Sequence, residues 1–139
     1  MEAANPANQP GAPSPAGRIR PGDVFVVDPF TVYLAPIPGA KPKRETRWVA
    51  VISSEADCNE KWCRTLLVVV LSRGTQHFWA RHDVLIAKGD GGVEEEVIAQ
   101  CDTVFPMLKT DLLAGTFKDQ LLKDTVAQIR AKVAKLIGT

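Results

Sequence analysis

Apolar residues along the chain fall into short runs separated by turn-forming residues, a pattern typical of a small β-rich domain. Runs dominated by β-branched and other apolar residues predict strands at residues 24–27, 48–52, 65–72 and 97–104. Residues 76–86 alternate less regularly and predict a less buried strand. Turns are expected at Pro21-Gly22-Asp23 and across residues 89–92, where glycine permits a change of chain direction.

The hydrophobic period changes near the C-terminus, where apolar residues recur every three or four positions. This spacing is that of one face of an amphipathic helix. Asp119 is expected to cap the start of this helix, and Gly138 to mark its end. The apolar positions of the helix are Leu122, Val126, Ile129, Val133, Leu136 and Ile137. Short strands followed by one long helix predict a mainly β (α+β) domain, a small barrel that the helix covers.

Two segments depart from this pattern. Residues 1–17 are rich in Pro, Ala and Asn, with almost no bulky side chains, and predict a disordered tail ahead of a domain at residues 18–139. Residues 28–46 contain several prolines and predict a long loop. Loops of this length inside compact domains are often functional.

Composition narrows the class of protein. The 139 residues are 45% hydrophobic, which is enough for a core, and the net charge of +1 gives no argument for a nucleic-acid partner. Three cysteines, an odd number, do not indicate a secreted disulfide framework. The longest apolar run is too short to cross a membrane, and the N-terminus does not resemble a signal peptide. A soluble, cytoplasmic protein without a membrane partner is expected.

Several motifs, taken in order, resemble the MazF/PemK toxin family. The chain opens with a basic residue and Gly-Asp before the first strand, and a later strand begins with Arg. A further strand ends in Ser, and a Gly-Gly turn precedes a strand that ends in Cys-Asp. The matching segments are Arg20-Pro21-Gly22-Asp23-Val24, residues 47–52, residues 66–72, residues 83–86, Gly91-Gly92-Val93 and residues 97–102. With the terminal helix, the resemblance covers about residues 18–138.

The resemblance implies an SH3-like barrel of about five to seven strands with a C-terminal helix, assembled as a homodimer. It also implies the toxin of a type II toxin–antitoxin module, whose cognate antitoxin covers the active site. Many members of the family cleave single-stranded RNA without a metal or other cofactor, leaving 2′,3′-cyclic phosphate and 5′-hydroxyl ends. The family's active-site Arg corresponds to Arg47, and its Thr or Ser corresponds to Ser72.

Arg47 and Ser72 suit this chemistry. Attack of a ribose 2′-hydroxyl on the adjacent phosphate requires proton transfer and stabilisation of negative charge on the phosphorane. A guanidinium is a permanent cation with paired donors, and a hydroxyl can donate to a phosphate oxygen. If their strands are antiparallel neighbours, the start of one meets the end of the other. The alternative is that both residues are ordinary strand-end residues.

A second candidate region interleaves aromatic and basic residues over residues 76–82. His77, Trp79 and Arg81, preceded by Arg73, could bind RNA through base stacking and phosphate contacts. A histidine could also transfer a proton near neutral pH. An ordinary strand that alternates between core and solvent explains the same pattern.

Departures from the family pattern favour a second hypothesis. Phe105 stands where some members have an arginine that acts as general acid, and Pro106 follows it. A phenyl ring cannot donate a proton to the leaving oxygen. The alternative function is therefore a catalytically inactive barrel that binds a protein or nucleic acid through the same surface.

The spacing of two cysteines and two histidines superficially resembles that of zinc-finger ligands. Cys58 and Cys63 share their spacing with His77 and His82. The intervening strand separates the two pairs by on the order of 20 Å, whereas zinc–ligand bonds are only about 2.0–2.3 Å long. No metal site is predicted.

Overall fold

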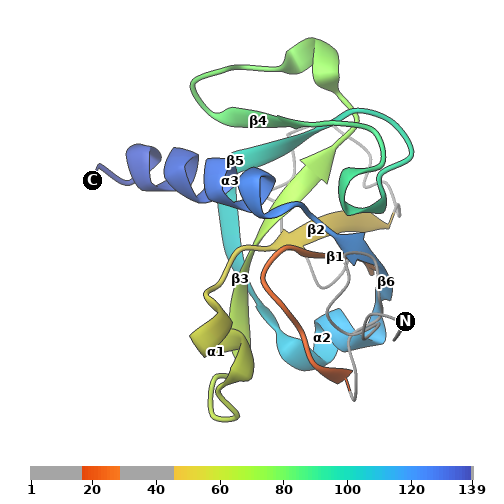
Figure 1. The fold of residues 1–139 in the computed structure, drawn as a ribbon, viewed down its shortest axis with the longest axis vertical. Coiled ribbons are helices and arrows are strands. Elements are labelled where there is room, and N and C mark those ends of the chain that lie inside the picture. Colours follow the sequence, from red (N-terminus) through yellow and green to blue (C-terminus); the bar gives the residue numbers. More distant parts are fainter. Residues whose placement is uncertain (1–16, 29–45, 139) are drawn as a thin grey trace, which may run out of the picture.

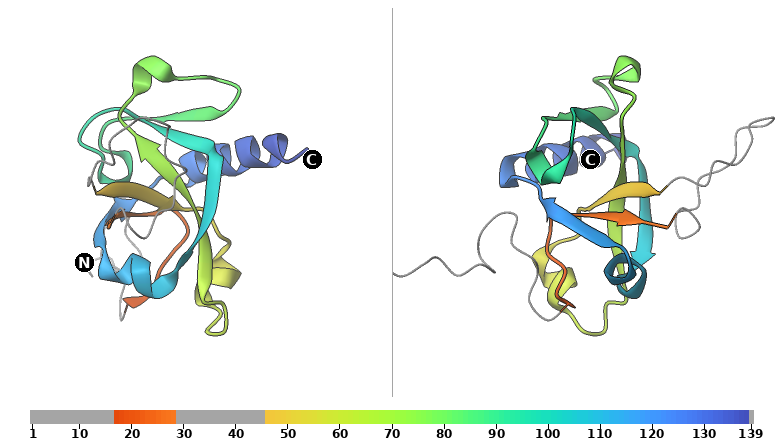
Figure 2. Two further views of the ribbon diagram at one scale, coloured as in Figure 1. Left: turned by 180° about the vertical axis from the view of Figure 1, so that it is seen from behind. Right: turned by 90° about the vertical axis from the view of Figure 1, so that its right-hand side faces the viewer.

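The computed structural model describes residues 17–28 and 46–138. Its core is one antiparallel sheet in the order β4-β5-β3-β2-β1-β6, which curls into a half-barrel (Figures 1 and 2). The strands are β1 (Asp23–Val27), β2 (Arg47–Val51), β3 (Thr65–Ser72), β4 (Asp83–Ile86), β5 (Val97–Leu108) and β6 (Thr116–Gln120). The prediction of a mainly β barrel-like domain with five to seven strands is confirmed.

Within the described residues, three α-helices and two 3₁₀ turns connect or cover these strands. They are α1 (Glu55–Asn59), η4 (Thr75–His77), η5 (Asp90–Gly92), α2 (Lys109–Ala114) and α3 (Lys123–Leu136). Helix α3 is the amphipathic helix that the sequence predicts, and it crosses one side of the sheet (Figure 2). The predicted tail and the predicted long loop fall mainly on residues 1–16 and 29–45, which lie outside the described residues.

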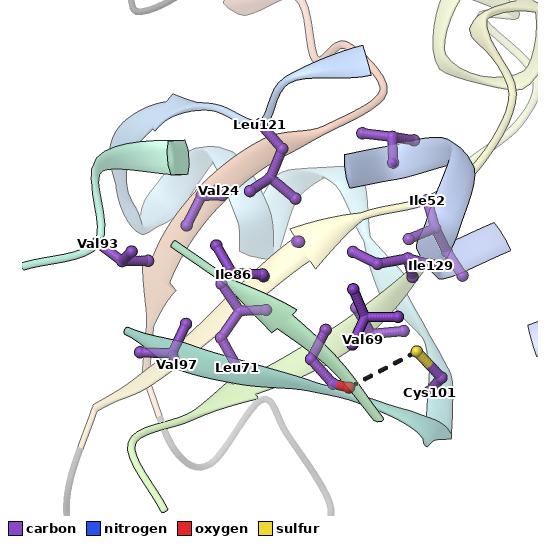
Figure 3. Packing of buried hydrophobic residues seen from close by; sticks show 14 residues of the cluster. Val24, Ile52, Val69, Leu71, Ile86, Val93, Val97, Cys101, Leu121 and Ile129 are labelled. Carbon is purple, nitrogen blue, oxygen red and sulfur yellow. Dashed lines mark hydrogen bonds between the residues drawn. The ribbon is translucent and has the colours of Figure 1, made fainter. Parts of the chain in front are cut away.

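The sheet has an apolar cluster on each face, because successive side chains of a strand point to opposite sides. One cluster contains Val69, Leu71 and Ala99 of the sheet and is closed by Ile129 of α3 (Figure 3). The other contains Val49, Val68 and Val70 and is closed by Leu112 of α2. This two-sided burial explains why β3 appears in the sequence as a nearly continuous apolar run.

The pairing of β5 with β3 changes register part-way along the two strands. Val69 lies opposite Val104, whereas the next β3 residue, Val70, lies opposite Gln100. Cys101, Asp102 and Thr103 therefore have no register partner on β3. A bulge of this kind bends a strand and increases its twist. Beyond the bulge β5 continues to pair with β3 as far as Leu108, whereas the sequence predicted an end at residue 104.

The Arg-Pro-Gly-Asp opening has a structural role. The Asp23 carboxylate is fully buried and accepts hydrogen bonds from the Arg20 backbone N–H at 2.8 Å and from Arg20 Nε at 3.2 Å. Gly22 has φ +85°, and a Cβ there would lie 2.9 Å from Val126 Cγ2 of α3. The motif thus fixes the entry to β1 against the helix.

The predicted N-cap Asp119 is wrong. Asp119 lies in β6 opposite Val24, and α3 begins at Lys123 after the N-cap position Leu122. The cap comes from another part of the chain: Asp90 of η5 accepts hydrogen bonds from the Leu122 backbone N–H at 2.9 Å and from Thr125 Oγ1 at 2.5 Å. The predicted end at Gly138 agrees with a helix that finishes at Leu136.

The predicted strand over residues 76–86 is correct only for β4. Residues 75–77 form η4, and the Trp79 backbone N–H donates to the buried Asp83 carboxylate at 2.9 Å. The polar residues before Asp83 therefore form a turn that Asp83 closes. In the described part of the chain, no helix is long and apolar enough to span a membrane.

Candidate active site

A groove of about 590 Å³ opens where the start of β2, the end of β3 and the first half of β5 meet. Arg47 and Ser72 both border it, and each is partly exposed. The groove is lined by Thr46, Arg47, Trp48, Val70, Leu71, Ser72, Arg73, Gly74 and Gln100. The two residues that the sequence analysis selected therefore lie at one site.

Strand register explains this meeting. β2 and β3 are antiparallel, with Trp48 opposite Leu71 and Val49 opposite Val70. Arg47 therefore lies at the same end as Ser72, and strand alternation places both on the face that carries Val49 and Val70. Below the groove this face is buried, since Val49 is fully buried and Val70 is 3% exposed.

Both polar groups have free capacity for a ligand. The Gly74 backbone N–H donates to Ser72 Oγ at 3.3 Å, which leaves the Ser72 hydroxyl proton available for donation. Within residues 17–28 and 46–138, no carboxylate forms an ion pair with Arg47. A phosphate in the groove would be an acceptor for both side chains.

Gln100 is a groove residue that the sequence analysis missed. It lies on β5 opposite Val70, so its side chain shares the face of Arg47 and Ser72. The amide offers both donors and an acceptor. Its only sequence signal is a polar residue inside an apolar strand, because the pairing of β3 with β5 depends on the register shift.

The aromatic and basic segment contributes unevenly to the groove. Arg73 borders it and forms an exposed ion pair with Glu95 at 3.3 Å. His77 lies at its edge, because a Cβ built on Gly74 would be 3.3 Å from His77 Cδ2 and 3.7 Å from Ser72 Oγ. Trp79 and Arg81 are exposed but do not line the groove. The Trp79 ring instead packs on His82, with centroids 4.0 Å apart.

Phe105 belongs to the core rather than to the groove. It lies opposite Val68 on β5 and packs against the cluster beneath α2. The side chain that replaces the family's arginine therefore fills apolar space. Phe105 is not among the described residues that line the groove.

The pairs considered for zinc lie at opposite ends of β3. Cys58 is in α1, before β3 begins, whereas His77 is in η4, after β3 ends. Among the described residues, no group of three or more His, Cys, Asp or Glu side chains could hold a metal ion. The three cysteines are free thiols.

Two of these thiols should make stability fall at alkaline pH. Burial raises the pKa of both Cys58 and Cys101 from 9.0 to about 11. Because the folded-state pKa is the higher one, the stabilisation is complete below pH 9 and is lost between about pH 9 and 11. Urea unfolding should give a free energy lower at pH 10.5 than at pH 8, by on the order of 1–2 kcal/mol per thiol.

The control for this alkaline effect is a protein with Cys58→Ala and Cys101→Ala together. Lysine and tyrosine also titrate in this range, so the comparison between proteins is decisive. The double variant should show a flatter dependence on pH than the wild-type protein. If the unfolding free energy fell equally steeply with pH in both proteins, groups other than the two thiols would cause the loss of stability.

Comparison with solved structures identifies the fold. An endoribonuclease from a mycobacterial species superposes with a TM-score of 0.63 at 15% identity, covering 87% of this chain and 92% of that chain. MazF in a MazE–MazF crystal structure from Deinococcus radiodurans gives a TM-score of 0.63 at 14% identity over 88% of this chain and 97% of that chain. The crystal structure of MazF (Form-I) from that organism gives a TM-score of 0.60 at 14% identity, over 87% of this chain and 97% of that chain.

The fold is therefore that of the MazF toxins. Identities of 14–15% establish the architecture and not the activity. No family model matches the sequence, and no curated protein matches it. The proposed function consequently depends on the groove.

Proposed function

We propose that this protein is the toxin of a type II toxin–antitoxin module and cleaves single-stranded RNA in the groove between β2, β3 and β5, without a metal ion. The observation that carries the proposal is the convergence of Arg47 and Ser72 at this groove, on a fold shared with MazF endoribonucleases. Because solved neighbours include complexes with an antitoxin, a cognate antitoxin is the proposed protein partner. We further propose a homodimer that acts in the cytoplasm.

The proposed reaction is an internal transfer at phosphorus. The 2′-oxygen loses its proton and forms a bond to phosphorus, and the bond from phosphorus to the 5′-oxygen breaks. The 5′-oxygen takes up a proton, which gives the 2′,3′-cyclic phosphate and the 5′-hydroxyl. Arg47 and Ser72 would hold the non-bridging oxygens and stabilise the phosphorane charge.

His77 is the proposed proton-transfer residue in place of the absent arginine. It is exposed at the edge of the groove, beside Gly74 and therefore near Ser72. A histidine side chain can act as a general acid or base in proton transfer. Arg73 would add positive charge on the path of the RNA, and Gln100 would orient the nucleotide. Trp79 and Arg81 are proposed to contact RNA outside the groove.

The test is cleavage of single-stranded RNA by the purified protein in the presence of a chelator. We expect cleavage to continue with excess EDTA and the products to carry cyclic phosphate and 5′-hydroxyl ends. Mass spectrometry of the 3′ ends, and labelling of the 5′ ends by a kinase, measure this outcome. Loss of activity in the chelator, with recovery on adding a divalent ion, would contradict the metal-independent mechanism.

A second candidate function is binding without cleavage. The observation that favours it is Phe105, which packs against the apolar cluster beneath α2 and offers no proton at the groove. In that case RNA or a protein partner binds and Arg47 still contributes, but no new RNA ends form. A gel-shift experiment performed beside the cleavage assay distinguishes the two functions.

A further inference from the structure

Trp48 and Lys118 form an aromatic–cation pair next to the groove. Lys118 Nζ lies 5.2 Å from the centroid of the Trp48 ring. Trp48 is partly exposed, and Lys118 of β6 is exposed. An exposed ammonium over the ring shows that this face of the indole can be reached from solvent.

The backbone around the pair is firmly placed. Trp48 lies opposite Leu71 and packs against the cluster beneath α3. Lys118 lies against η5, because a Cβ on Gly92 would be 3.3 Å from Lys118 Cβ and 3.0 Å from Asp119 Cβ. Packing therefore fixes the backbone of both residues, and the Lys118 ammonium stands at the end of a flexible four-carbon side chain.

The pair adjoins the proposed active site. Trp48, Leu71 and Arg73 border both the groove and a smaller hollow that is also lined by Val93, Glu94, Glu95 and Val97. Of the two carboxylates that line this hollow, Glu95 forms an ion pair with Arg73. Arg47 and Trp48 are consecutive residues at the rim of the sheet and point to opposite faces. A strand of RNA with a phosphate at Arg47 can cross this rim and bring a neighbouring base to Trp48.

We propose that Trp48 and Lys118 form a nucleotide-binding subsite in which one base of single-stranded RNA stacks on the indole. The base takes the place of the Lys118 ammonium, which moves to an adjacent phosphate. This inference rests on the proposed RNA substrate and adds a binding site for it. Stacking on an aromatic ring is largely independent of sequence, because every base has a π face.

The experiment measures binding of a 2′-O-methyl RNA oligonucleotide, which has no free 2′-hydroxyl and is not cleaved. A second oligonucleotide carries the same backbone with abasic positions. Trp48→Leu should weaken binding of the first oligonucleotide by about tenfold, because the base can no longer stack on the indole. Trp48→Leu should leave binding of the abasic oligonucleotide almost unchanged. Trp48→Phe should keep most of the wild-type affinity for the oligonucleotide that carries bases.

Trp62→Leu is the matched control. Trp62 is 74% exposed, has Lys61 Nζ 5.0 Å from its ring centroid, and precedes β3 at the end away from the groove. Its replacement should leave the affinity for both oligonucleotides unchanged. Circular dichroism melting confirms that each variant is folded, and Trp48→Phe covers the case in which Trp48→Leu unfolds.

The outcomes separate this subsite from the proposed function. If Arg47→Ala weakens binding and a folded Trp48→Leu protein binds like wild type, the subsite is wrong and the RNA substrate stands. An equal loss with the intact and the abasic oligonucleotide would also overturn the subsite, since stacking requires a base. If wild-type protein binds neither oligonucleotide, the RNA substrate itself is wrong.

Discussion

Replacement of Arg47 by alanine is expected to lower the rate of RNA cleavage by on the order of 10²–10³-fold. This is the usual cost of removing one preorganised donor from an oxyanion-type site. Arg47 should have a large effect because it is the partly buried cation on the groove face shared with Ser72 and Gln100. Single-turnover cleavage of a labelled RNA gives the rate directly.

Two further variants test whether the loss of rate is specific to the guanidinium at position 47. Arg47→Lys keeps the charge but loses the paired donors of the guanidinium, so a rate between those of wild type and Arg47→Ala is expected. Arg64→Ala removes an exposed arginine immediately before β3, at the end away from the groove, and should leave the rate unchanged. Cleavage by Arg47→Ala at the wild-type rate would remove Arg47 from the mechanism.

Replacement of Ile129 by alanine is expected to lower the free energy of unfolding by about 2–5 kcal/mol, as large-to-small substitutions in cores do. Ile129 is fully buried where α3 packs on the sheet, in the apolar cluster that also contains Val69 and Ile86 (Figure 3). Truncation leaves a cavity that the surrounding strands cannot fill without moving. Urea denaturation followed by circular dichroism measures the change.

Ile137→Ala, at the C-cap position of α3, is the matched control. Ile137 is 73% exposed, so its truncation removes little buried apolar surface from the monomer. A change within about 0.5 kcal/mol is expected, as for other exposed positions. An equal decrease in the free energy of unfolding for Ile129→Ala and Ile137→Ala would contradict the packing of α3 on the sheet through Ile129.

Much of the architecture was predictable because its signals are local. β3 occupies residues 65–72, as its apolar run indicates, and the period of three and four residues identifies α3. The resemblance to the MazF/PemK family indicated the order of elements and singled out Arg47 and Ser72. Elements with weak local signals were missed: α2 and β6 carry no clear period, and the turn before β4 resembles a strand.

The sequence by itself determined which segments form the central strands and which helix is amphipathic, because both follow from side-chain periodicity. The family resemblance singled out Arg47 and Ser72, and the antiparallel pairing of β2 with β3 in the structure brings them to one rim. The tertiary structure alone decided that Asp90 rather than Asp119 caps α3, and that Gln100 joins the groove. It also decided that Lys118 lies over Trp48. Those contacts join residues far apart in the chain, so they depend on the bulge in β5 and on the closure of β6 onto β1, which no local pattern encodes.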